Sequence, residues 1–236
     1  LESSGNIGMV CPKIRFFTPP RLIQFAGYTP LTSITMRNHG IGCGDKDRGQ
    51  YNTAHPTPYA HGAAMMVKRE AVKKAGLMPE DYFLYYEELD WSMMIRRSGY
   101  EIWYEPASEI FHKESATTGQ NSPLRTYYIM RNRGYLARYM QIYGDYHPVL
   151  FRLGNAATFC KEFIRLAAVD KCFKTGIPAL RRGMKDARKI IKDPDWKPMP
   201  PMKDTGMNTA INTSEEVITA LLIPFIASIL AIYDDL

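Results

Sequence analysis

Three carboxylates crowd together beside a run of aromatic residues in the middle of the chain. Glu87, Glu88 and Asp90 fall within four positions and follow directly after two tyrosines. Like charges at this spacing raise each other's pKa, and apolar neighbours raise it further by removing water. A carboxylate with a raised pKa can accept a proton near neutral pH, so this segment predicts a general base. We assign that role to Glu88, which precedes the helix that we expect to start at Asp90.

A structural interpretation of the same residues competes with the catalytic one. Asp90 can cap a helix that continues through Arg97 and stops at Gly99, and carboxylates favour the positive end of a helix dipole. For Asp90 alone, capping is the better interpretation. For Glu88, the functional interpretation is favoured.

Two further groups suggest ligand binding. His112 ends an apolar segment and opens a polar loop, where an imidazole could reach a metal or a phosphate, although a lone histidine is more often structural. Tyr128, Arg131 and Asn132 share one face of a predicted helix. An arginine in such a cluster suits a bidentate phosphate contact, and an ion pair with the carboxylates near residue 88 is the competing explanation.

Asp45 and Asp47 form a DxD pattern that superficially suggests a metal and nucleotide-diphosphate site. They lie in a glycine-rich loop rather than at the end of an apolar strand that would hold them rigidly. We therefore assign them no metal.

The elements that must position these groups alternate between strands and helices over the first 147 residues. Turn-forming residues recur between 18 and 60, which predicts a long loop there, and Pro106 is expected to stop a strand. This order is typical of an α/β fold. We expect strands at about 7–17, 63–67 and 100–104, and helices at 69–75, 90–97 and 123–143.

The composition changes after Pro148. Between residues 152 and 192, eleven Lys or Arg stand against three acids, which leaves +8 and exceeds the +6 of the whole chain. Apolar residues interleave with these cations, so basic amphipathic helices are predicted. A solvated helix face and a membrane-contacting surface remain equally open.

The last segments are a predicted linker, 193–214, and a predicted apolar helix, 215–236. The 17 residues 217–233 carry no charge and are slightly fewer than a bilayer span needs. A membrane-spanning helix, a peripheral helix and a helix packed on a partner all remain open.

The chain as a whole has the composition of a globular domain, with 236 residues, 45% hydrophobic and 23% charged. Four cysteines without CxxC spacing indicate neither a zinc site nor a disulfide framework, and they fit a reducing compartment. The net charge favours anionic partners. Nucleic acid is not expected among them, because the cations lack a recognisable motif or interleaved stacking residues.

Several segments together resemble the family 2 glycosyltransferases, in particular the rhamnosyltransferase-like branch that builds bacterial surface polysaccharides. Their order and spacing match the family across residues 5–140. The matching segments are 8–14, 49–51, 62–65, 83–91, 112–113 and 127–133.

This resemblance implies a GT-A type fold, in which a mixed sheet flanked by helices binds a nucleotide-diphosphate sugar with a divalent metal. Glu88 would be the catalytic base, taking the proton from an acceptor hydroxyl as its oxygen attacks the anomeric carbon in line, with inversion. Asp90 would support that base beside Glu87, and His112 would ligate Mn²⁺ or Mg²⁺. Residues assigned to donor or acceptor binding are Gly62, Ala63, Trp91, Arg131 and Asn132.

The resemblance also implies a division of the chain. Residues 1–147 resemble the C-terminal part of a GT-A domain, whose N-terminal nucleotide-binding half with its DxD motif is absent from these 236 residues. Residues 148–192 resemble the helical extension of relatives that act on lipid-linked acceptors.

The implied function is the transfer of a sugar to a surface-polysaccharide or lipid-linked glycan acceptor. The protein would be cytoplasmic and peripheral at the inner face of the bacterial membrane. The alternative is a truncated, non-catalytic module that binds a membrane or a partner chain through residues 152–236.

Overall fold

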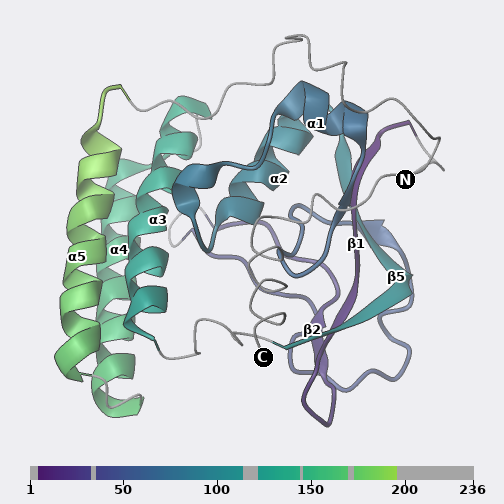
Figure 1. Ribbon diagram of the computed structural model, residues 1–236, viewed down its shortest axis with the longest axis horizontal. Coiled ribbons are helices and arrows are strands. Elements are labelled where there is room, and N and C mark those ends of the chain that lie inside the picture. The colour runs from purple at the N-terminus through teal and green to yellow at the C-terminus, as the bar shows by residue number, and fades with distance from the viewer. Residues whose placement is uncertain (1–4, 33–35, 114–121, 144–145, 170–172, 196–236) are drawn as a thin grey trace, which may run out of the picture.

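The computed structural model describes residues 5–32, 36–113, 122–143, 146–169 and 173–195. A β-sheet lies at one end of the molecule, three long helices lie at the other end, and two shorter helices lie between them (Figure 1). The fold of the described residues is therefore a mixture of sheet and flanking helices, as expected from the sequence.

The sheet is mixed and is built around its first strand. β1 pairs in parallel with β5 and in antiparallel fashion with β2 and β4, and β3 pairs antiparallel with β5. The strands are β1 (Ile7–Phe16), β2 (Ile23–Phe25), β3 (His55–Pro56), β4 (Met66–Val67) and β5 (Glu101–His112). The first strand is buried along most of its length, as is typical of a central strand with a parallel neighbour.

The prediction that Pro106 stops a strand is wrong. β5 continues through this proline to His112, and the pairing with β1 jumps from Pro12–Glu105 to Lys13–Glu109. Both strands carry a proline at this point and neither proline can donate a ladder hydrogen bond, so the extra residues of β5 bulge and the pairing resumes beyond them. The two apolar segments of the sequence are therefore one bulged strand.

Two helices and a 3₁₀ turn cover the sheet on the side of the three long helices. They are α1 (Arg69–Ala75), η1 (Glu80–Tyr82) and α2 (Glu87–Arg97). α1 has the predicted bounds, but α2 begins three residues earlier than expected, because the N–H of Asp90 already bonds to the carbonyl of Tyr86 at 3.1 Å. The prediction that Asp90 caps this helix is therefore wrong.

The remaining helices pack side by side. They are α3 (Pro123–Tyr143), α4 (Pro148–Ile164), the π-helical turn η2 (Arg165–Val169) and α5 (Phe173–Lys192). α3 and α5 touch at the backbone, since a Cβ on Gly134 would lie 2.7 Å from the Cα of Ala187. This contact joins segments on either side of the predicted boundary at 147–148, and the division into domains stays a prediction.

Within the described residues, none of the helices combines the length and the apolar character that a membrane crossing requires. Of the predicted linker 193–214, only residues 193–195 are described. The predicted apolar helix 215–236 lies outside the described residues.

Candidate functional site

Glu88 lies in the first turn of α2, next to the segment that contains Gly62. A Cβ built on Gly62 would come within 3.9 Å of the side-chain carbons of Glu88, which is ordinary contact distance. Ser92 connects the two segments, because its hydroxyl accepts from the N–H of Ala60 at 2.9 Å and donates to the carbonyl of Glu88 at 2.6 Å. Gly62 is exposed and adds no side chain, so it approaches the half-buried Glu88 with its backbone alone.

Burial and a neighbouring charge make Glu88 a weaker acid than usual. Loss of water raises its pKa to about 8, and Glu87 contributes to the same shift. Burial also raises the pKa of Glu87. A carboxyl group whose pKa lies near neutral pH can both accept and release a proton, which is the property that the sequence predicted for this position.

Asp90 lies deeper than Glu88 and faces the core. It is 1% exposed, and its Oδ2 accepts a hydrogen bond of 2.7 Å from the hydroxyl of Tyr82. Burial raises the pKa of Asp90 to about 7, although the bond from Tyr82 opposes this shift. Asp90 therefore stabilises the start of α2 from the core side, through its bond with Tyr82, and does not act as a helix cap.

The turn that leads into α2 has an unusual backbone. Phe83, Tyr85 and Tyr86 have φ angles of +61°, +69° and +75°. Residues other than glycine rarely adopt this left-handed region, and each such residue costs about 1 kcal/mol or more unless its surroundings hold it. The first residue of α2 therefore depends on contacts that stabilise this turn.

Asn132 of α3 supplies the main contacts. Its fully buried amide nitrogen lies 3.0, 2.6 and 2.8 Å from the carbonyl oxygens of Tyr82, Leu84 and Tyr85. Arg131 adds two bonds of 2.7 Å to the carbonyls of residues 81 and 82, and its Nε donates to the Asn132 side-chain oxygen at 2.9 Å.

These bonds change the interpretation of Arg131 and Asn132. Among the described residues, Arg131 bonds to main-chain oxygens and to Asn132, and no ion pair with the carboxylates near residue 88 is present. Nη2 of Arg131 and the amide nitrogen of Asn132 bond to the turn before α2. Their predicted contact with a donor or acceptor remains untested.

His112 stands at the end of β5, close to a second histidine. Its Nδ1 lies 2.9 Å from Oε1 of Gln24, an oxygen that can only accept, so this nitrogen donates. The ring centroids of His61 and His112 are 6.1 Å apart. His61 directly precedes Gly62. The same short segment therefore lies near His112 through one residue and near Glu88 through the next.

His61 is neutral at physiological pH. Burial, helped by the charge on His112, lowers its pKa to about 4. Its Nδ1 accepts the N–H of Ala63 at 3.0 Å, so the proton of the neutral ring is on Nε2. Ala63, predicted to contact a ligand, thus fixes the orientation of this imidazole through its backbone.

The described residues do not complete a metal site around His112. No group of three or more His, Cys, Asp or Glu side chains in this part of the chain is arranged to hold a metal ion. One or two imidazoles alone make an incomplete ligand set for Mn²⁺ or Mg²⁺, which prefer several oxygen ligands. Further ligands would have to come from outside the described residues.

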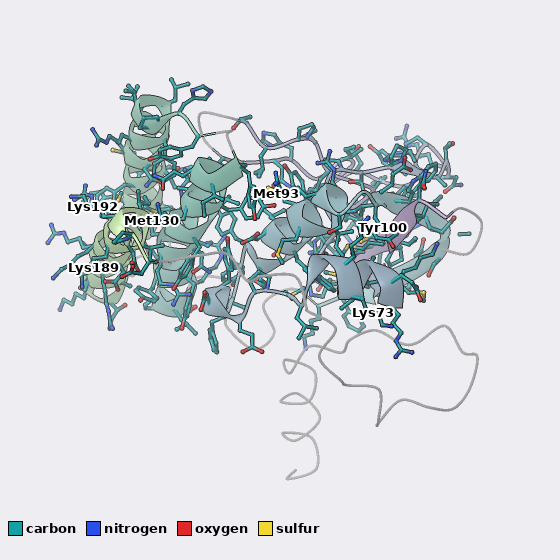
Figure 2. The ribbon with its side chains drawn as sticks, turned by 90° about the horizontal axis from the view of Figure 1, so that it is seen from above. Lys73, Met93, Tyr100, Met130, Lys189 and Lys192 are labelled. Carbon is teal, nitrogen blue, oxygen red and sulfur yellow. The ribbon has the colours of Figure 1, made fainter. Side chains whose placement is uncertain are left out.

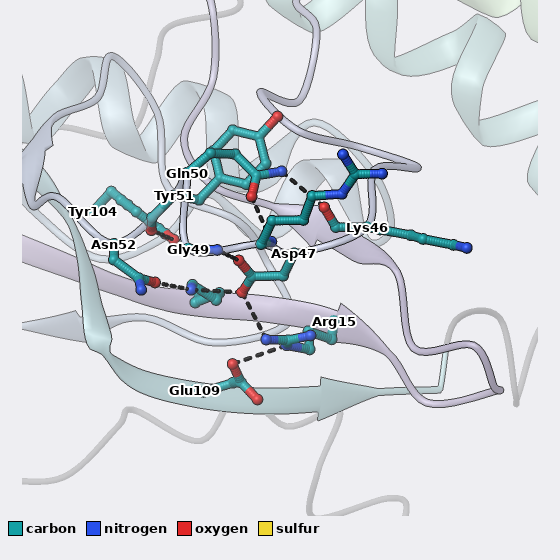
Figure 3. A network of polar contacts seen from close by, with 11 residues as sticks. Arg15, Lys46, Asp47, Gly49, Gln50, Tyr51, Asn52, Tyr104 and Glu109 are labelled. Atoms are coloured by element: carbon teal, nitrogen blue, oxygen red, sulfur yellow. Dashed lines mark hydrogen bonds and ion pairs between the residues drawn. The ribbon is translucent and has the colours of Figure 1, made fainter.

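Asp47 of the DxD pattern lies in a different network of polar contacts (Figure 3). Oδ2 of Asp47 is 2.8 Å from Lys13 Nζ and 2.6 Å from Arg15 Nη2, and Oδ1 accepts the N–H of Gly49 at 2.9 Å. The bond from Lys13 is the main reason that the pKa of Asp47 is lowered, and the bond from Gly49 adds to it. This carboxylate fixes the loop to β1.

Trp91 is placed in the core rather than in an open site. It is 3% exposed, and its indole N–H donates to the carbonyl of Gly76 at 3.0 Å. These are the contacts of a packing residue between α1 and α2. The structure therefore offers no surface of Trp91 on which a donor or acceptor could bind.

Sequence reasoning missed three members of this region: His61, Tyr82 and Ser92. His61 could have been found from its place directly before the glycine of the 62–65 segment. For Tyr82 and Ser92 the sequence offers no comparable signal, because their bonds depend on the strained turn and on the approach of residue 60 to α2.

Known proteins with related sequences are glycosyltransferases. The chain is 29% identical over 114 residues to an N-acetylglucosaminyl-diphospho-decaprenol L-rhamnosyltransferase of Mycobacterium tuberculosis, a match that covers 48% of this chain and 36% of that protein. It is 28% identical over 86 residues to the low-salt glycan biosynthesis hexosyltransferase Agl10 of Haloferax volcanii, covering 36% of this chain and 28% of that protein. No protein-family model matches the chain.

These matches confirm the resemblance to glycosyltransferases that the sequence motifs indicated. The matched segment spans about a third of the length of each curated relative. The similarity therefore concerns a part of those enzymes.

Proposed function

We propose that this chain is the acceptor-side part of an inverting glycosyltransferase with a GT-A type fold. It would transfer a sugar from a nucleotide-diphosphate sugar to a glycan or a lipid-linked acceptor. The observation that carries the proposal is Glu88, a carboxyl group with a raised pKa on the first turn of α2, next to the exposed Gly62.

In this reaction Glu88 acts on the acceptor. Its carboxylate takes the proton from an acceptor hydroxyl, whose oxygen forms a bond to the anomeric carbon of the donor sugar. The bond from that carbon to the diphosphate breaks, and the nucleoside diphosphate leaves with the electron pair. Attack from the side opposite to the leaving group inverts the anomeric centre. General-base help of this kind contributes about 10²–10⁴ in rate.

The other groups of the site have supporting roles in the proposal. Asp90 and Tyr82 hold the start of α2 from the core side, and Asn132 holds the turn before it. Glu87 keeps a second negative charge close to Glu88, which helps to keep the pKa of the base high. Positioning of this accuracy matters, because a misplaced base loses much of its effect.

A divalent metal is part of the proposal, with His112 as one ligand. The chemistry that it would supply is stabilisation of the leaving diphosphate. Since the described residues offer an incomplete ligand set, the remaining ligands would come from the nucleotide-binding half that the resemblance implies.

The relatives suggest the substrates to test first. One of them is named as a rhamnosyltransferase that acts on an N-acetylglucosaminyl-diphospho-decaprenol, and the other as a hexosyltransferase of glycan biosynthesis. We therefore propose a hexose or deoxyhexose donor and an acceptor whose sugar is carried by a diphospholipid.

Calorimetric titration with dTDP and UDP, with and without Mn²⁺, tests whether this chain contributes to a donor site. We expect Mn²⁺-dependent binding that weakens in His112→Ala and is unchanged in His39→Ala, an exposed histidine elsewhere. If neither nucleotide binds, the chain by itself has no donor site and the non-catalytic alternative is favoured. Binding that is unaffected by His112→Ala contradicts the assigned metal ligand.

A further inference from the structure

α4 carries an apolar stripe that faces solvent. Its members recur every three or four residues and so lie on one side of the helix. The three largest are strongly exposed: Val149 at 66%, Leu153 at 61% and Ile164 at 63%. Smaller exposed residues complete the stripe, which consists of Val149, Leu153, Ala156, Ala157, Cys160 and Ile164. A contiguous exposed patch of this kind marks a surface that contacts something apolar.

A groove of about 400 Å³ runs beside this stripe, between α4 and α5. α4 contributes small and aromatic residues to it, and α5 contributes three cations and a methionine. The lining residues are Ala156, Phe159, Cys160, Arg181, Met184, Lys185 and Arg188. Because Ala156 and Cys160 belong both to the stripe and to the groove, apolar surface and a row of cations meet along one line.

The cations of α5 are poorly neutralised. Asp186 lies 3.8 Å from Arg182 and from Lys189, and it also accepts a hydrogen bond from Tyr127. Among the described residues, no acid forms an ion pair with the three cations of the groove. α5 lies at the outer edge of the molecule, where Lys189 and Lys192 project away from the sheet (Figure 2). The positive charge is therefore presented outward.

We propose that the groove between α4 and α5, with the adjoining stripe of α4, docks on an anionic lipid bilayer. Both helices would lie in the plane of the interface, with the stripe in the boundary between headgroups and acyl chains and the cations at the level of the lipid phosphates. Charge complementarity favours an anionic bilayer, because an uncharged apolar partner would leave the row of cations without counter-charges. The proposal does not depend on glycosyl transfer.

Co-sedimentation of the 236-residue chain with lipid vesicles tests the proposal. We expect binding to phosphatidylcholine vesicles that contain about 30% phosphatidylglycerol, and little binding to pure phosphatidylcholine. Binding should fall as the salt concentration rises towards about 0.5 M, because screening weakens the attraction between cations and lipid phosphates.

Charge reversal in the groove gives the sharper test. The triple variant Arg181→Glu, Lys185→Glu and Arg188→Glu should lower the partition coefficient at least about a hundredfold. The matched control, Lys46→Glu, Arg48→Glu and Lys73→Glu, changes three exposed cations elsewhere and has the same net charge. We expect this control to bind nearly as well as the unaltered chain, apart from the general effect of net charge.

The apolar contribution is tested separately on the stripe. Leu153→Asp should weaken binding at least about tenfold, whereas Leu77→Asp, an exposed leucine between α1 and η1, should not. Circular dichroism and thermal unfolding establish that each variant folds.

Three results would overturn the proposal. The first is absence of vesicle binding, as expected if the groove holds a protein segment instead. The second is equal binding by the unaltered chain and the groove variant, as expected if a segment outside the described residues makes the contact. The third is an equal loss of vesicle binding in the groove variant and in its control, which would mean that the net charge of the chain alone explains the effect.

Discussion

The carboxylates at the start of α2 and the carboxylate of Asp47 lie in opposite electrostatic surroundings, although both occur as short acidic clusters in the sequence. Burial and a like charge raise the pKa of Glu88 to about 8. Asp47 lies between Lys13 and Arg15 and has a lowered pKa. The difference comes from what surrounds each acid, since β1 supplies cations to one cluster while aromatic residues and a second acid surround the other.

Under the proposed function, this contrast separates a reactive group from a structural one. A carboxylate that is stabilised by two cations stays ionised near neutral pH and does not accept a proton from a substrate there. Within the described part of the chain Glu88 forms no ion pair with a cation, so in the proposed reaction its carboxylate can take the proton of an acceptor. Pairs of acids whose environments move their pKa values apart are a common sign of a site.

The largest expected effect comes from removing the reactive acid. In an enzyme that contains these residues with their nucleotide-binding half, Glu88→Gln should lower the transfer rate about 10²–10⁴-fold, because an amide cannot take the acceptor proton. Donor affinity by calorimetry should stay nearly unchanged. Glu80→Gln, which alters an exposed acid in η1, is the control and should keep full activity. Undiminished turnover in Glu88→Gln would remove Glu88 from the reaction.

Removing the structural acid should affect stability instead. Asp47→Ala leaves Lys13, which is 3% exposed, without its main counter-charge, and we expect a loss of about 3 kcal/mol in the free energy of unfolding. Asp45→Ala breaks only an exposed bond from Tyr51 and should cost less than about 1 kcal/mol. Denaturant titration measures both. Equal losses in the two variants would mean that the Lys13–Asp47 pair contributes little.

The turn before α2 offers a test of how the reactive cluster is held. Asn132→Leu removes an amide whose two N–H groups are shared among three carbonyl oxygens, and it should cost about 2 kcal/mol of unfolding free energy. Gln141→Leu, which removes one side-chain bond to Arg138 on the same helix, should cost about 0.5 kcal/mol. If the Asn132 variant is as stable as the Gln141 variant, the strained turn is held by other contacts.

Much of the architecture follows from local sequence patterns. The first strand, α1 and α3 have nearly the predicted bounds, because a Pro or Gly stands at or close to an end of each. The start of α2 could not be predicted in the same way. Asp90 matches a helix cap in sequence, but its side chain turns to Tyr82, a partner supplied by the positive φ angles of the residues between them.

The site shows a similar division. The raised pKa of Glu88 could be predicted from the residue types around it in the sequence, because burial and like charge act locally, while its role as a base stays a prediction. The roles of Arg131 and Trp91 depend on which distant segments reach them, namely residues 81–82 and Gly76. Local spacing contains no information on such contacts, and the predicted contacts of these residues with a donor or acceptor stay predictions.

The smallest expected effect concerns the bond between Tyr82 and Asp90, and it depends on pH. The pKa of Asp90 in the folded chain, about 7, lies above its ordinary value of 3.8. The folded state therefore binds more protons than the unfolded state between these values, and the contribution of Asp90 to stability falls as the pH rises through about 7. The hydroxyl of Tyr82 limits this fall, because its bond favours the charged form.

Tyr82→Phe should therefore raise the pKa of Asp90 further and cost more stability at high pH than at low pH. We expect a loss of about 1–2 kcal/mol near pH 9, where the bond is to a carboxylate, and about half of that near pH 5, where the group is protonated. Tyr51→Phe, which removes a bond to the exposed Asp45, should show a small loss that is equal at both pH values. Unfolding free energies at the two pH values measure the difference. If Tyr82→Phe lowers the unfolding free energy equally at the two pH values, Asp90 does not titrate in this range. The contrast with the acids of the 45–47 loop would then rest on Glu88 alone.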